Sequence, residues 1–191
     1  MASNDSDLLE LIPVKHALLY GLAACFITFL LIGMLFSSAA SSDFKQDIDD
    51  ADVGEEEFSA IVFFNAHLVQ VEANGESWNY LTGEDAQLFN VPSLLFFAVP
   101  IAVLFLAGRR FVTKHDDRIS DKNEAAKIGA SLVIGYFPMV FILQSAARVT
   151  VSGGFGQSVT LSPSSGTALL LAGMLFPVVV GGLAGYYSYD E

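Results

Sequence analysis

The stretch that decides the fold is HALLYGLAACFITFLLIGMLF, residues His16–Phe36, in which no residue carries a formal charge. A membrane-spanning helix needs about 20 mostly apolar residues, whereas a helix on a soluble protein carries a polar stripe along one face. This run is apolar on every side, so lipid is the solvent that suits it best. It predicts a transmembrane helix.

Three further charge-free runs have similar composition, namely Val91–Gly108, Ile128–Ala147 and Gly166–Tyr187. The first of these is the shortest and contains Pro92 and Pro100, so a buried core helix is the alternative for it. We expect an all-α fold, a four-helix transmembrane bundle with an acidic extracellular segment that contains a short amphipathic helix.

The overall composition agrees with a membrane protein and excludes several other classes. Apolar residues make up 53% of the chain and charged residues only 16%, yet the net charge is −12. Nucleic-acid binding is excluded because no basic surface is present to neutralise phosphates. A disulfide scaffold is excluded because Cys25 is the only cysteine.

The distribution of basic residues predicts the orientation, because cytoplasmic loops are enriched in Lys and Arg. Seven of the nine basic residues fall on one side of the expected spans: Lys15, Arg109, Arg110, Lys114, Arg118, Lys122 and Lys127. Only Lys45 and Arg148 fall on the other side. We therefore expect a plasma-membrane protein with a cytoplasmic N-terminus (1–15), a first span (16–36), an acidic outer segment (37–90), a second span (91–108), a basic cytoplasmic loop (109–127), a third span (128–147), an outer loop (148–165), a fourth span (166–187) and a cytoplasmic C-terminus (188–191).

The outer segment holds nearly all of the negative charge. Its acidic residues are Asp43, Asp47, Asp49, Asp50, Asp52, Glu55, Glu56, Glu57, Glu72, Glu76, Glu84 and Asp85, with Lys45 as the single basic residue. Their spacing lacks the alternation and the glycine of a calcium-binding loop, so we expect no metal site. Excess surface acid suits concentrated salt, where cations screen the repulsion, and indicates an extreme halophile. The first part of the segment, 37–57, is expected to be a solvated, mobile linker.

Within the outer segment, residues 58–71 (FSAIVFFNAHLVQV) are apolar but too short to cross a membrane. They predict an amphipathic helix that lies on the outer membrane surface or caps the bundle. A strand is the alternative, because polar and apolar residues alternate around 67–72.

Three short stretches resemble a known family. They are Phe63-Phe64-Asn65-Ala66-His67, Gly135-Tyr136-Phe137-Pro138 and Phe176-Pro177-Val178-Val179-Val180-Gly181-Gly182. The first is similar to a Phe-Tyr-Asn-Ala-His signature of small, uncharacterised multi-pass membrane proteins of haloarchaea, although Phe64 stands where tyrosine is more usual. The resemblance implies a haloarchaeal four-helix membrane protein; some relatives carry a loose transporter label, and no catalytic residue carries over.

The spans contain no Asp, Glu, Lys or Arg and no His apart from His16 at an edge, and no two histidines have metal-ligand spacing. We therefore expect no enzyme activity, catalytic residue, cofactor or metal. The candidate polar or partner site consists of Asn65, His67, Arg148 and Gln144, with Arg148 paired to Glu57 or Glu72. The alternative for Asn65 and His67 is that their hydrogen bonds hold the surface segment on the helix ends.

Small residues four apart allow close helix packing in membranes. The pairs are Gly181 with Gly185, Ser131 with Gly135, and Gly21 with Cys25. Apart from the lipid bilayer, the expected partners are copies of the chain or a larger membrane complex.

Two classes of function follow. The first is a non-catalytic accessory or structural role with partner binding at the cell envelope. The alternative is a small oligomeric transporter or channel, whose polar path would use Gln144, Tyr136, Thr28 or backbone freed by the span prolines.

Overall fold

The structure is a computed structural model that describes residues 12–152 and 158–189. Most of the expected N-terminal segment 1–15, part of the expected outer loop 148–165 and the end of the expected C-terminus 188–191 lie outside the described residues. Four helical stretches are long and apolar enough to cross a membrane, which confirms the predicted number: Val14–Ala39, Leu94–Lys114, Lys122–Ala146 and Ser165–Ser188.

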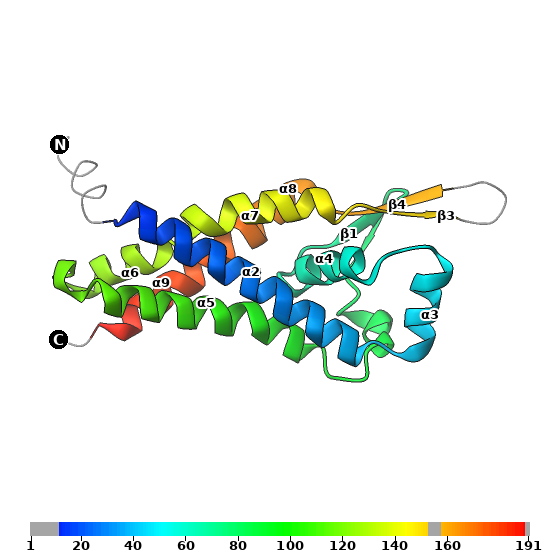
Figure 1. Ribbon diagram of the computed structural model, residues 1–191, viewed down its shortest axis with the longest axis horizontal. Helices are drawn as coiled ribbons and strands as arrows, with labels where there is room; N and C mark the ends of the chain where they lie inside the picture. The colour runs from blue at the N-terminus through cyan, green and yellow to red at the C-terminus, as the bar shows by residue number, and fades with distance from the viewer. Residues whose placement is uncertain (1–11, 153–157, 190–191) are drawn as a thin grey trace.

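The four stretches lie along one another and form the long axis of the molecule (Figure 1). Helix α2 (Val14–Ala39) packs on α5 (Leu94–Lys114) and on α7 (Val133–Ala146). Helix α9 (Phe176–Ser188) packs on α5 and on α6 (Lys122–Ala130). The start of α2 and the end of α9 lie at one end, and the elements between α2 and α5 gather at the other (Figure 1).

The basic connection is shorter than the expected loop 109–127. Helix α5 begins at Leu94, after Pro92, and continues through the basic residues to Lys114. After the short 3-10 turn η2 (Asp116–Arg118), α6 begins at Lys122, because the Asp121 carboxylate accepts hydrogen bonds from the backbone N–H groups of Asn123 and Glu124 at 2.7 and 2.9 Å. The third stretch therefore starts six residues before the expected 128, and it turns at 131–132 before α7 begins.

The fourth stretch changes its helical pattern midway. A short α8 (Ser165–Thr167) leads into a π-helical segment, η4 (Ala168–Leu175), and then into α9. Pro177 lies in the first turn of α9 and has no N–H to donate. The π-helical segment, whose turns are wider, therefore ends just before Pro177, where the backbone hydrogen-bond pattern of the helix is interrupted.

The end of the molecule opposite the start of α2 is hereafter called the cap, and it comprises α3 (Ser42–Asp50), α4 (Glu55–Ala66), the 3-10 helix η1 (Gly83–Leu88) and a small sheet. The prediction of a mobile linker at 37–57 is wrong. Helix α2 continues to Ala39, and α3 (Ser42–Asp50) follows, with Ser41 as its N-cap. Phe44 and Ile48, one turn apart, are buried beneath α3, while its aspartates face outward. The burial of this apolar pair explains why so acidic a segment is helical.

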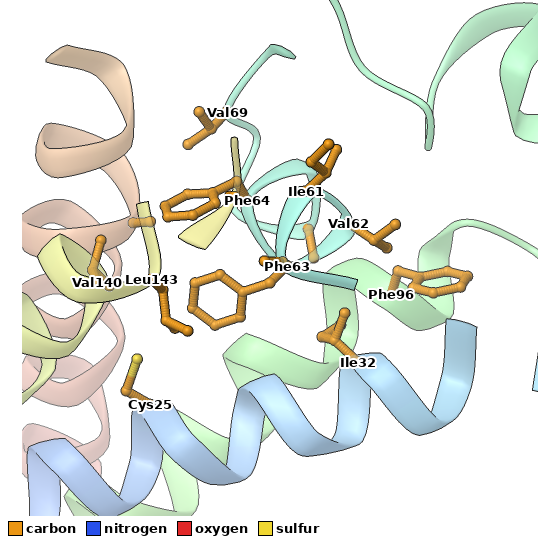
Figure 2. Close-up of a cluster of buried hydrophobic side chains, with 14 of the residues drawn as sticks. Cys25, Ile32, Ile61, Val62, Phe63, Phe64, Val69, Phe96, Val140 and Leu143 are labelled. Atoms are coloured by element: carbon orange, nitrogen blue, oxygen red, sulfur yellow. The ribbon is translucent and has the colours of Figure 1, made fainter. Parts of the chain in front are cut away.

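Helix α4 (Glu55–Ala66) corrects the predicted amphipathic character of residues 58–71, which were expected to lie on the outer membrane surface or to cap the bundle. Every residue from Phe58 to Ala66 is buried, so the helix has no exposed face beyond its first turn. Figure 2 shows Phe63 pointing toward α2 and Val62 toward Phe96 of α5. The helix contacts α2, α5 and α7, and because it is apolar on all sides, every face beyond its first turn is covered.

The cap also contains a small antiparallel sheet that the all-α prediction did not include. Its strands are ordered β2-β1-β4-β3, with bounds Glu76–Trp78, Val71–Ala73, Ser158–Pro163 and Val149–Ser152 respectively. Residues Val71 and Trp78 pair across β1 and β2, and Val71 also pairs with Pro163 of β4. The sheet thereby joins the α4–α5 connection to the α7–α8 connection. The 3-10 helix η1 (Gly83–Leu88) then leads back to α5.

Candidate functional site

The best-defined polar site surrounds His67, the C-cap residue directly after α4. Its Nδ1 lies 2.7 Å from the carbonyl oxygen of Phe63, and its Nε2 lies 2.8 Å from the hydroxyl of Tyr136 on α7. A carbonyl can only accept, so Nδ1 carries the hydrogen and donates it. Nε2 of the neutral ring then accepts from the Tyr136 hydroxyl, and the imidazole is fixed in one tautomer.

The surroundings of this pair are dry. His67, Tyr136, Cys25 and Thr28 all have no exposed surface, and the rings of Phe63 and Phe176 lie 4.4 and 4.9 Å from the His67 ring. Burial lowers the pKa of His67, which lies outside the four apolar stretches, to about 4. The site therefore holds a neutral histidine at neutral pH.

All three stretches that carry the sequence resemblance meet at this point. His67 belongs to the first stretch, Tyr136 to the second and Phe176 to the third. The hydrogen bond to Tyr136 and the ring contact with Phe176 join them. This convergence links α4 to α7 and α9 through one side chain.

Acidification should weaken the fold through His67. The pKa of His67 is about 4 in the fold and about 6.5 when unfolded, so its contribution is complete above pH 6.5 and falls as the pH drops toward 4. We expect a loss of about 2 kcal/mol at pH 5, from about 1.4 kcal/mol per pKa unit. Denaturation in detergent at pH 7.5 and pH 5 measures it. The variant His67→Gln should show a smaller pH dependence, and an equal dependence in both proteins would contradict the assignment.

Asn65 forms a second buried network at the end of α4. Its amide donates to the carbonyl of Val69 at 2.9 Å, and its Oδ1 accepts from the backbone N–H of Tyr80 at 3.1 Å. Asn79 donates to the backbone carbonyl of Asn65 at 3.0 Å and accepts from the N–H of Leu81 at 2.9 Å. The two asparagines thus bind the chain that leaves α4 to the chain that follows β2.

Replacing Asn65 with alanine should loosen this junction. The change leaves the Tyr80 N–H and the Val69 carbonyl without the Asn65 side chain in a buried site, at a cost of about 2–4 kcal/mol. Limited proteolysis should then cut residues 72–90 faster than in the native protein. The matched change Asn90→Ala, at an exposed position whose side chain makes no hydrogen bond with a described residue, should leave cleavage unchanged. Equal cleavage of all three proteins would refute the role of Asn65.

The structure places the other two predicted site residues, Arg148 and Gln144, apart from Asn65 and His67. Arg148 is exposed between α7 and β3, and it makes no ion pair with Glu57, Glu72 or any other described residue. Gln144 lies on α7, two turns beyond Tyr136, and is 9% exposed. Its side chain makes no hydrogen bond with a described residue. The four residues therefore do not form one cluster.

The predicted small residues lie at two close helix crossings. A Cβ added to Gly21 of α2 would lie 2.8 Å from the Cα of Gly135 of α7. Gly181 and Gly185 of α9 face α6, where a Cβ on Gly181 would lie 2.5 Å from the carbonyl oxygen of Gly129. Ser131 lies at the turn between α6 and α7 and donates to the carbonyl of Ile128 at 2.6 Å.

Chemically, the described residues supply hydrogen bonds and packing. Within 12–152 and 158–189, no three His, Cys, Asp or Glu side chains are grouped so that they could hold a metal ion. In the same part of the chain, no fully buried side-chain nitrogen or oxygen lacks a hydrogen-bond partner. These fully buried polar atoms are therefore engaged in holding the helices and the cap together, whereas the side chain of Gln144 is not.

Four long apolar helices, closely packed and joined to a small cap, are compatible with a multi-pass protein embedded in a membrane. Residues 1–190 match the family of unknown function DUF7978, and the chain belongs to this family. No curated protein and no solved structure matches it.

Proposed function

We propose that the protein is a non-catalytic integral membrane protein of a halophilic archaeon, which presents its acidic cap on the outer face of the plasma membrane to a partner. The observation that carries this proposal is the division of polar groups in the cap. The buried ones, among them His67 and Asn65, make internal hydrogen bonds. The exposed carboxylates form no ion pair with any described residue.

The orientation rests on charge. Arg109, Arg110 and Lys114 lie at the end of α5 that is remote from the cap, and Arg118, Lys122 and Lys127 follow in the same region. Lysines and arginines favour the cytoplasmic side of spans. The cap, which holds the acidic residues of 37–90, then lies outside, with both termini in the cytoplasm.

Helix α3 is the part of the cap that suits a partner best. It lies at the far end of the molecule from the start of α2 (Figure 1), and Asp43, Asp47, Asp49 and Asp50 are exposed on it. Phe44 and Ile48 fix it from beneath. A rigid row of carboxylates complements a basic protein surface and would steer such a partner toward the cap.

Crosslinking in native membranes tests this proposal. We expect a defined partner to be captured by the native protein and lost from the variant Asp47→Asn/Asp49→Asn/Asp50→Asn. The control Glu72→Gln/Glu76→Gln/Glu84→Gln removes the same charge elsewhere in the cap and should retain the partner. Equal capture by all three proteins, or by none, would contradict the proposal.

A small oligomeric transporter or channel is the second candidate, and the π-helical segment η4 favours it. Such segments are rare and frequently occur at functional sites, and Phe176, directly after η4, contacts His67. Against it, Tyr136 and Thr28, which the expected polar path would use, have no solvent-exposed surface. Solute flux into proteoliposomes that is abolished by Tyr136→Phe would favour this candidate over the first.

A further inference from the structure

One face of α5 is uncovered along the whole helix. The residues that line its two surface grooves recur every three or four positions: Leu94, Phe97, Ala98, Ile101, Ala102, Phe105 and Leu106 in the first, and Leu106, Arg109, Arg110, Thr113 and Lys114 in the second. Positions with this spacing share one helix face. The opposite face is buried, with Pro100, Leu104 and Gly108 among its residues.

The first groove is lined by apolar residues only and has a volume of about 530 Å³. Leu94 and Leu106, at its two ends, are 74% and 64% exposed, so no described residue covers it. At 1.5 Å per residue the groove extends about 18 Å along α5. This length is close to half of the roughly 30 Å hydrocarbon core of a bilayer.

The second groove continues the first, since Leu106 lines both, and its volume is about 880 Å³. Three cations line it, Arg109, Arg110 and Lys114, and no acidic residue does. None of the three forms an ion pair with a described residue. Tyr20 of α2 closes the groove on one side, with the Lys114 Nζ 5.8 Å from the centre of its ring.

We propose that this surface of α5 binds one anionic phospholipid from the leaflet at the basic end. The phosphate lies among Arg109, Arg110 and Lys114, and one of the lipid's hydrocarbon chains follows the apolar groove toward Leu94. Charge complementarity argues for this occupant, because three uncompensated cations attract an anionic headgroup. The apolar groove has the length of one leaflet, and Tyr20 belongs to a residue type that favours the headgroup level.

A second copy of the chain fits the surface less well. Two-fold symmetry about the membrane normal would bring the same surface of each copy together. The Arg109–Arg110 pair of each copy would then approach its counterpart, and like charges repel. The lipid site is independent of the partner proposed for the cap and of which side of the membrane the basic end faces.

Native mass spectrometry of the full chain in detergent tests the lipid site. Phosphatidylglycerol and phosphatidylcholine with identical acyl chains are offered in competition. We expect phosphatidylglycerol to be retained at least about tenfold better, because each basic residue near an anionic lipid adds favourable energy. Equal retention of the two lipids by the native protein would overturn the proposal without any variant.

Variants locate the site. Arg109→Gln/Arg110→Gln/Lys114→Gln should abolish the preference, whereas Lys15→Gln/Arg118→Gln/Lys127→Gln removes three cations from the same end outside the groove and should retain it. If the first triple variant is not monodisperse, Lys114→Gln alone should still reduce the preference. Equal loss in both triple variants would show a general charge effect and refute the groove.

Two further outcomes would also overturn the proposal. Displacement of the lipid by excess glycerol phosphate, which has the anionic group without acyl chains, would show a site for the headgroup alone. A dimer that forms as the lipid is removed, and that Leu106→Trp disrupts, would assign the surface to a second copy. We expect instead that glycerol phosphate displaces little and that the delipidated chain stays monomeric.

Discussion

Replacing Gly21 with alanine should prevent α2 and α7 from packing. The added Cβ would lie 2.7 Å from the backbone nitrogen of Tyr136 and nearer still to the carbonyl oxygen of Leu132. Both are backbone atoms, so neither can turn aside, and the two helices must separate. Overpacking of a core costs about 1–3 kcal/mol, and we expect a value at or above the top of that range. Thermal unfolding and gel filtration in detergent measure the effect.

Gly33 provides a matched control on the same helix. A Cβ at this position would meet only the side chain of Ser59, at 3.7 Å, which is ordinary contact. Gly33→Ala should therefore remain as stable as the native protein or gain slightly from its higher helix propensity. If Gly21→Ala and Gly33→Ala unfold at the same temperature, the close crossing of α2 and α7 is wrong.

Replacing Phe58 with alanine should release the cap while the long helices stay assembled. Phe58 is 4% exposed and joins α4 to α2, to α3 and to the chain after β2. Its ring centre lies 5.5 Å from that of Phe36 on α2, 5.3 Å from that of Phe44 on α3 and 5.1 Å from that of Tyr80. Removing a buried phenylalanine costs about 3–5 kcal/mol, which is comparable to the stability expected for a unit of this size.

Hydrogen exchange resolved by segment measures this effect. Amides of α3 and of residues 76–90 should exchange faster in Phe58→Ala, while those of α7 and α9 should be unchanged. Leu68→Ala serves as the control, because Leu68 is 56% exposed. Uniform acceleration across all helices would show that the cap is not a separate unit of stability.

The four apolar helices were predictable because charge-free runs of this length have few alternatives to a membrane span. The residues at which these helices begin and end were not predictable, because apolar composition marks only the part of a helix that suits lipid. Lys114 continues α5 beyond the predicted residue 108, and Asp121 starts α6 before the predicted residue 128. Side-chain capping and the good helix propensity of Arg and Lys determine these ends.

The cap was less predictable because its structure depends on contacts remote in sequence. Residues 58–71 were expected as an amphipathic helix on the membrane surface or capping the bundle, but burial against α2, α5 and α7 leaves α4 no exposed amphipathic face. The strand alternative applies only to the end of that stretch, where β1 begins at Val71. The partner of β1 in β4 lies more than 80 residues later, a pairing that no local pattern indicates.

The candidate site shows the same limit. Asn65 and His67 stood out as polar residues in an apolar run, and hydrogen bonding was among their predicted roles. Their partners did not stand out: Tyr136 was expected to line a path for a solute, and Asn79 was not singled out. Gly129, whose carbonyl oxygen lies close to Gly181, belongs to none of the predicted pairs. Those pairs consisted of residues four apart on one helix, whereas Gly129 and Gly181 lie on different helices.

The central claim is that the chain crosses the membrane four times with the acidic cap outside and the basic end inside. Cysteine labelling in intact cells tests it most directly, since Cys25 is the only cysteine and is fully buried. In a Cys25→Ala background, a membrane-impermeant maleimide should label Asp49→Cys in intact cells and Arg118→Cys only after permeabilisation. Labelling of Arg118→Cys but not of Asp49→Cys in intact cells would contradict the orientation, and labelling of both would contradict the four crossings.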